Sequence, residues 1–260
     1  MIKHREIEIG KETHDSGNVP KKPGRIPGLR DVVSVERATA TKARESWHVL
    51  GIMSEFFEAS ERLAQIRPAV SIFGSARIPA GDPRYDMAEL IARKLSEAGF
   101  SVISGGGPGI MEAANKGAFN AGGKSIGLNI KLAHEKKPNL YQTHSLHFEY
   151  FVSRKATFFM HSAAYIALPG GFGTLDELFE VLTLIQTRKI PQVPVVLVGT
   201  QFWAGMIDWV KEQLLPARLI DGDSMDMLTV TDDVDLIMRQ IQAFCAEYSE
   251  QLGDTAILPE

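Results

Sequence analysis

The chain has 260 residues, 44% of them hydrophobic, so it can bury one large core, and a single α/β domain often reaches this size. Its 28 basic and 32 acidic residues give a net charge of -4, which attracts neither nucleic acid nor an anionic membrane surface. The lone cysteine, Cys245, excludes an intrachain disulfide and a multi-cysteine metal cluster and fits a reducing compartment. Residues 1–25 contain no apolar run of signal-peptide length, and no stretch of about eighteen uncharged apolar residues occurs. We therefore expect a cytoplasmic protein without a membrane span.

The first predicted elements are a tail and a helix. Residues 1–30 are rich in Lys, Pro and Gly and lack a hydrophobic period, which predicts a flexible tail or a strap across a partner subunit. Between residues 31 and 67, a series of residues recurs at three- and four-residue steps: Val49, Met53, Phe56, Ser60 and Leu63. That spacing predicts a helical arm, which packs on the main body or on another subunit.

Residues 68–250 alternate between short apolar strands and helical patterns. Strands are expected at 69–75, 100–107, 124–130, 163–171 and 193–199, the last of these being the last clear strand. Helices are expected at 85–99, 109–122, from Thr174 to about Arg188, and at 232–249, and residues 147–152 lead into another. Apolar strands without polar alternation, separated by helices, predict a Rossmann-like parallel sheet covered by helices on both faces. After this domain, residues 251–260 form a predicted C-terminal tail.

Glycines gather where three of these strands end. They are Gly74 after the first strand, Gly105, Gly106, Gly107 and Gly109 after the second, and Gly170, Gly171 and Gly173 near residue 170. Ligands of open parallel sheets bind at the carboxyl ends of strands, and glycine lets backbone amides approach an anion closely. Turns between strands and helices also need glycine for their geometry, so either interpretation fits a single loop. Two loops of this density favour a phosphate site, although neither has the spacing of a dinucleotide fingerprint and Gly123-Lys124-Ser125 lacks the first glycine of a P-loop.

Three segments together carry a family resemblance. They are PGGFGTLDE at 169–177, SGGGPGIMEAANKGA at 104–118 and SRK at 153–155. They closely resemble the LOG family of cytokinin riboside 5'-monophosphate phosphoribohydrolases, formerly described as possible lysine decarboxylases, and the tail and arm resemble its longer bacterial branch. The resemblance implies hydrolysis of the N-glycosidic bond of a nucleoside 5'-monophosphate, AMP or an N6-modified AMP, to free base and ribose 5-phosphate. It implies no cofactor and no metal.

Cleavage of a C–N glycosidic bond develops positive charge on the sugar. A nearby carboxylate can stabilise this charge or orient the attacking water. Glu177 is predicted to be that carboxylate, and Arg154 to hold the nucleotide and stabilise the departing base. The phosphate is expected against the amides that open the helix after residue 170. The predicted substrate-binding residues are Gly74, Ser75, Gly106, Gly107, Glu112, Lys155, Gly170, Gly171, Phe172, Gly173 and Thr174.

Structural interpretations stand beside these roles. Thr174 and Glu177 fit a capping box, in which the threonine begins the helix and the glutamate reaches back to its amide. Arg154 and Lys155 fit a surface ion pair, and Glu112 fits a carboxylate that only favours its helix N-terminus.

The partners and the alternatives follow from the same resemblance. It implies a homodimer or a higher homo-oligomer such as a hexamer, with neither nucleic acid nor a membrane as partner. A non-catalytic nucleotide or molybdenum-cofactor carrier is the alternative function, because carriers of related fold also use glycine loops. A lysine decarboxylase is disfavoured, since no lysine has a recognisable pyridoxal-phosphate context.

Overall fold

The computed structural model describes residues 35–132, 137–226 and 228–252. The chain divides into two compact units, residues 1–47 and 48–260. Helix α2 (Val35–Arg62) begins in the first unit and ends in the second, in agreement with the helix predicted between 31 and 67. The predicted tail at 1–30 and all but two residues of the tail at 251–260 lie outside the described residues. Within the described part, no helix combines the length and the apolar character needed to cross a membrane.

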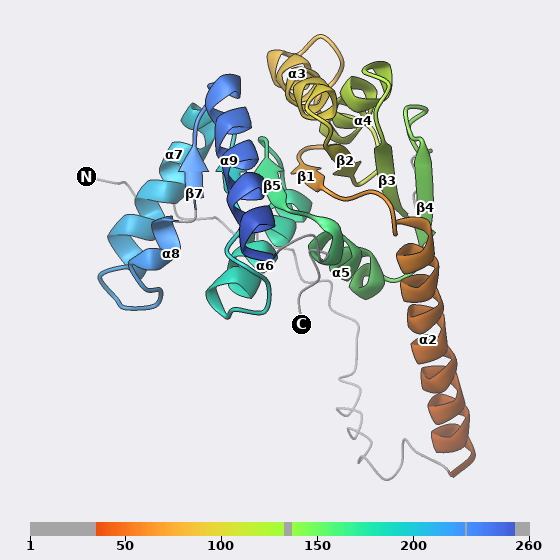
Figure 1. The fold of residues 1–260 in the computed structure, drawn as a ribbon. Coiled ribbons are helices and arrows are strands. Elements are labelled where there is room, and N and C mark those ends of the chain that lie inside the picture. The colour runs from red at the N-terminus through yellow and green to blue at the C-terminus, as the bar shows by residue number, and fades with distance from the viewer. Residues whose placement is uncertain (1–34, 133–136, 227, 253–260) are drawn as a thin grey trace, which may run out of the picture. The chain divides into compact units, whose positions relative to one another are not determined.

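The second unit is built on a seven-stranded sheet (Figure 1). Its strands lie in the order β4-β3-β2-β1-β5-β6-β7, and every neighbouring pair is parallel. Their bounds are β1 (Ala69–Phe73), β2 (Ser101–Ser104), β3 (Ser125–Ile130), β4 (His144–Phe148), β5 (Ala164–Ala167), β6 (Val195–Leu197) and β7 (Leu228–Val230). The predicted parallel sheet is confirmed.

Helices connect these strands. They are α3 (Pro83–Glu97), α4 (Ile110–Asn120), α5 (Phe151–His161), α6 (Phe172–Gln186), α7 (Thr200–Trp209), which runs on into a π-helical turn (Val210–Leu214), α8 (Asp223–Asp226) and α9 (Val234–Leu252). Helix α3 shows why the local sequence fixes these bounds. The Asp82 carboxylate accepts a hydrogen bond from the Arg84 amide, and Pro83 occupies the first turn, where an amide donor is not needed. Gly99 follows the helix at φ +90°, as predicted.

Two hydrophobic cores cover the two faces of the sheet. On β1, Val70 and Ile72 point into the core that includes residues of α3, α4 and α9. Ala69 and Phe73 point into the opposite core, which includes residues of α5, α6 and α7. Because both sides of the strand are buried, its sequence is apolar throughout instead of alternating with polar residues. The prediction of helices on both faces is confirmed.

The later part of the domain departs from the prediction. The segment 193–199 is not the last strand, because β7 pairs with β6 at the edge of the sheet. β7 has three half-buried residues, so it lacks the fully buried apolar run by which the central strands were predicted. Helices α7 and α8 were not predicted. Leu63, directly after α2, is buried, whereas Val49 and Met53 in α2 are about half exposed.

The strand order creates a switch point beside β1. The chain proceeds outward from β1 through β2 and β3 to β4, and then returns to place β5 on the other side of β1. The connections that leave β1 and β5 therefore run to opposite sides of the sheet, which opens a crevice at their carboxyl ends. Gly74 and Ser75 follow β1, and Gly170 and Gly171 follow β5, so the topology brings two of the predicted glycine loops to this crevice.

We predict that Gly109 tolerates no side chain. It has φ +72°, and an added Cβ would lie 2.3 Å from the Ser75 carbonyl oxygen. Gly109→Ala is expected to cost about 3 kcal/mol or more, from backbone strain together with a displaced loop. Gly122→Ala is the matched control, because Gly122 has φ +76° with no atom within 4 Å of its added Cβ. It should cost about 1–2 kcal/mol. Equal losses in denaturant melts would show that the contact with Ser75 does not constrain the loop.

Candidate active site

Backbone hydrogen bonds join three of the glycine loops. The Ser75 amide donates to the Pro169 carbonyl at 3.1 Å, which links the loop after β1 to the loop after β5. The Ser75 carbonyl accepts a hydrogen bond from the Ile110 amide at 3.0 Å, which links it to the start of α4. Gly74 has no room for a side chain, because an added Cβ would lie 2.4 Å from the Ile110 side chain. The three glycine loops predicted from the sequence are thus connected to one another at the carboxyl edge of the sheet.

Helix α6 begins earlier than predicted. Its N-cap is Gly171, and the bond from the Leu175 amide to the Gly171 carbonyl, at 3.0 Å, closes its first turn. The amides of Phe172, Gly173 and Thr174 therefore belong to the open helix end, where backbone donors lack partners within the helix. These are among the amides against which the phosphate was predicted to bind. Gly170 allows Thr174 to pack here, since an added Cβ would lie 2.1 Å from the threonine hydroxyl oxygen.

The capping-box interpretation does not hold in this structure. Thr174 lies inside the first turn instead of preceding it, and α6 has no side-chain capping hydrogen bond. The preceding glycines explain the difference, because Gly171 adopts the extended N-cap geometry and the helix can begin two residues sooner. Glu177 is consequently not needed to cap the helix.

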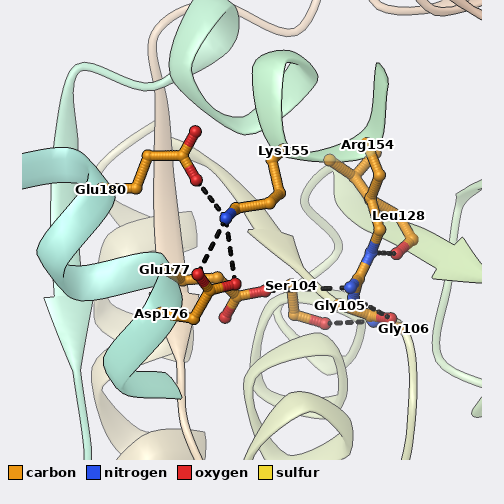
Figure 2. A network of polar contacts seen from close by, with 9 residues as sticks. All are labelled: Ser104, Gly105, Gly106, Leu128, Arg154, Lys155, Asp176, Glu177 and Glu180. Atoms are coloured by element: carbon orange, nitrogen blue, oxygen red, sulfur yellow. Dashed lines mark hydrogen bonds and ion pairs between the residues drawn. The ribbon is translucent and has the colours of Figure 1, made fainter. Parts of the chain in front are cut away.

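Arg154 is buried among backbone carbonyls (Figure 2). It lies on α5, 7% exposed, and its Nε donates to the Leu128 carbonyl at 2.7 Å. Its Nη2 donates to the Gly105 carbonyl at 3.3 Å, and its Cζ lies 5.6 Å from the centre of the Phe158 ring. Burial lowers the pKa of Arg154, and the nearby Glu177 carboxylate raises it. Because a guanidinium stays charged in proteins, the structure holds a fixed positive charge against the second glycine loop.

Glu177 faces this arginine from α6. Its Oε1 lies 3.8 Å from Arg154 Nη1, and its side chain is only 16% exposed. Burial raises the pKa of Glu177 to about 7, with Arg154 lowering it and Asp176 raising it. The carboxyl group therefore exchanges its proton close to neutral pH, which is the range useful to a general base.

Lys155 contacts carboxylates of α6. Its Nζ lies 3.0 and 2.9 Å from the two carboxylate oxygens of Asp176 and also forms an ion pair with Glu180 (Figure 2). Burial lowers the pKa of Lys155, and its two carboxylate partners outweigh this effect and raise it. Lys155 thus links α5 to α6, and it directly follows the buried Arg154 in the sequence.

Glu112 contacts α3 instead of the Arg154–Glu177 pair. Its Oε1 accepts a hydrogen bond from the Tyr85 hydroxyl at 3.0 Å. Burial and this carboxylate raise the pKa of Tyr85. Among the residues that the structure describes, no hydrogen bond or ion pair joins Glu112 to Arg154 or Glu177.

A buried amide network that the sequence did not reveal holds the second glycine loop. Gly106, at φ +73°, donates its amide to the Ser104 hydroxyl at 3.0 Å. Its carbonyl accepts from the Asn139 amide at 2.8 Å and from the Gln142 side chain at 2.9 Å. Asn115 joins Ser104, Ser125 and Asn139 beneath the loop. The sequence signal that could have indicated this network is the presence of polar residues inside predicted apolar strands, such as Asn129 in β3.

A cavity lies away from this edge. Its lining includes Arg67, Ala69, Ala163 and Val193, which stand at or before the amino ends of β1, β5 and β6. The glycine loops stand at the carboxyl ends of the strands, so the cavity and the candidate active site are on opposite edges of the sheet.

The sequence of this chain is similar to those of a known family and of several known proteins. A family model described as possible lysine decarboxylase matches residues 111–241. A cytokinin riboside 5'-monophosphate phosphoribohydrolase of Rhodococcoides fascians is 28% identical over 159 residues, which cover 57% of this chain and 78% of that protein. One from Arabidopsis thaliana is 36% identical over 104 residues, which cover 38% of this chain and 45% of that protein. The match spans about half of the length of the plant relatives.

A solved structure shares the fold. The molybdenum cofactor binding protein of Rippkaea orientalis aligns with a TM-score of 0.51 and 22% identity, over 70% of this chain and 99% of that one.

We predict that Glu177 makes the stability of the protein depend on pH. A carboxyl with pKa about 7 when folded and an ordinary value of 4.5 stabilises the fold while protonated, and this contribution is lost as pH rises through about 7. The difference corresponds to about 3 kcal/mol. Glu177→Gln, which stays neutral, should therefore melt at a higher temperature than the native protein at pH 8 and similarly at pH 4.5. Glu212→Gln, an exposed substitution, is the control. A constant difference at both pH values would contradict the prediction.

Proposed function

The chain belongs to the family described as possible lysine decarboxylase, and from that membership and the geometry of the site we propose that it is a phosphoribohydrolase. Its proposed substrate is a nucleoside 5'-monophosphate, AMP or an N6-modified AMP. Water would cleave the N-glycosidic bond, giving the free base and ribose 5-phosphate. The names of the relatives support the reaction class, and the residues support the chemistry.

The observation that carries the proposal is the buried Arg154–Glu177 pair beside the open end of α6. Burying a guanidinium and a carboxylate is costly unless both are paired and hydrogen-bonded. A hydrophobic pair of similar size would stabilise the fold as well or better, so the charges are better explained by chemistry. Strongly shifted pKa values such as that of Glu177 are concentrated at functional sites.

The phosphate would bind at the start of α6. The amides of Phe172, Gly173 and Thr174 are donors at the positive end of the helix, and the Thr174 hydroxyl is one more. The exposed Phe172 side chain leaves its backbone accessible to a ligand. Glu177 lies one turn further along the same helix, so phosphate and carboxylate are held in a fixed relation by a rigid element.

The reaction then needs a carboxylate at C1'. As the C–N bond breaks, its electron pair leaves with the base, which takes up a proton, and positive charge develops on the sugar. Ionised Glu177 would stabilise this charge and accept a proton from the attacking water. Arg154 would place a permanent positive charge where the base departs with its electron pair.

We predict that the native protein releases ribose 5-phosphate from AMP or isopentenyladenosine monophosphate and that Glu177→Gln lowers the rate at least about a hundredfold. That factor corresponds to about 2.7 kcal/mol of transition-state stabilisation. Sugar phosphate release is measured directly, alongside nucleotide binding and the melting temperature. The variant should bind nucleotide and melt no lower than the native protein.

Other results would separate the alternatives. Nucleotide binding without any sugar phosphate release by the native protein would indicate a carrier, whereas carbon dioxide release from lysine would indicate a decarboxylase. Native activity retained by Glu177→Gln would remove the carboxylate from the mechanism.

We further predict that kcat/KM rises with pH, with a midpoint at about 7, because the ionised form of Glu177 is the active one. Asp176→Asn should move the midpoint to lower pH, since the Asp176 charge is one of the causes that raise the pKa of Glu177. The pH profiles of the native protein and this variant test both points. A rise with an unmoved midpoint would mean that a different group titrates.

A further inference from the structure

Helix α5 begins without a cap from its own sequence. Its N-cap residue is Tyr150, and it makes no side-chain capping hydrogen bond. The first helical bond runs from the Arg154 amide to the Tyr150 carbonyl at 3.2 Å. The amides before it have no partner within the helix, so the helix itself does little to hold its own start in place. Arg154 and Lys155 both lie at this end of the helix.

Glu55 of α2, nearly a hundred residues away in the chain, holds this helix start from both sides of its N-cap residue without bonding the first-turn amides themselves. Its Oε1 accepts a hydrogen bond from the Glu149 amide at 2.7 Å, and its Oε2 accepts one from the Ser153 hydroxyl. Ser153 is fully buried and is adjacent to Arg154. A carboxylate at the start of a helix is also favoured by the helix dipole.

Close packing holds the two helices together at this point. Gly51 of α2 lies against Tyr150, because an added Cβ would be 2.7 Å from the tyrosine hydroxyl oxygen. The His48 ring lies 4.6 Å from the Tyr150 ring, centre to centre. Two turns of α2 beyond Glu55, Arg62 donates to the Ser145 carbonyl on β4 at 2.8 Å, which fixes the same helix to the sheet. Glu55 therefore sits on a well-anchored support.

We propose that Glu55 is a positioning residue for the reaction: by bonding Glu149 before the helix and Ser153 within its first turn, it sets the position of Arg154 against Leu128, Gly105 and Glu177. This proposal rests on the proposed function. The guanidinium meets two carbonyls and one carboxylate on three different elements, so a small shift of the helix start would misalign all three contacts. The hydrogen bonds of Glu55 go to Glu149 and Ser153, so it would act on Arg154 through the helix.

The expected kinetic effect is on kcat. The amides that would hold the phosphate belong to α6, whereas Glu55 contacts the start of α5. Glu55→Ala should therefore lower kcat at least about tenfold while KM for AMP changes less than about twofold, because misplacing a reacting group mainly weakens the transition state. Glu55→Gln keeps one acceptor oxygen of the two and should recover part of the loss. Glu61→Ala, an exposed substitution on the same helix, is the matched control and should leave kcat unchanged.

A double-mutant cycle distinguishes positioning from general damage. Arg154→Lys loses the planar fork that bonds both carbonyls, so the arginine geometry is already absent in that background. Adding Glu55→Ala there should lower kcat less than about twofold, since coupled residues are not additive. Hydrogen exchange of the amides at 149–156 should rise in Glu55→Ala and not in Glu61→Ala.

The outcomes separate the two proposals. If the native protein releases no ribose 5-phosphate, the proposed function fails, and the role of Glu55 in that reaction fails with it. If the native protein is active and Glu55→Ala matches Glu61→Ala in kcat, only the positioning role is overturned. A full additive loss in the Arg154→Lys background would also overturn it, since Glu55 would then act independently of the arginine.

Discussion

The burial of one guanidinium constrains the geometry of the whole site. Arg154 cannot shed its charge, so the fold must surround it with acceptors at fixed positions. The acceptors come from β3, from the loop after β2 and from α6, three elements that are distant in sequence. Their convergence requires the parallel order of β1, β2 and β3, and it requires α5 to begin at one particular residue. A loose loop or a frayed helix would leave a buried charge without partners.

This constraint explains why glycine occurs where it does. At Gly105 an added Cβ would lie 2.5 Å from the arginine Nη2, so the loop must lack a side chain to come within hydrogen-bond distance. At Gly106 the reason is different, because its positive φ and its contact with Asn129 leave no space for a Cβ. The second glycine loop is therefore shaped mainly by what lies beneath it, whereas the glycines near α6 leave a helix end open.

The sequence predicted the central architecture because its signal was local. Apolar runs such as 69–75 are buried on both faces, and Gly99 ends a helix by its own backbone geometry. β7 was missed because three half-buried residues at an edge carry little pattern. Sequence reasoning grouped Arg154 with Glu177 through their motifs. It could not find Glu55, which contacts α5 across 98 residues of chain and stands within an ordinary helical pattern.

Glu177 shows how the site opposes the stability of the fold. Burial raises its pKa to about 7, so near neutral pH the protein holds a carboxyl that the fold would prefer to keep protonated. A neutral residue at this position would stabilise the protein but could not accept a proton. Arg154 limits the effect, because its charge lowers the pKa that burial raises, and the two together leave the carboxyl able to change protonation near pH 7. The distance between their charged atoms, 3.8 Å, is longer than a hydrogen bond, which leaves the carboxylate oxygens less committed to the arginine than a bidentate pair would be. A reactive carboxylate requires this intermediate state, paired enough to be buried and free enough to act on water.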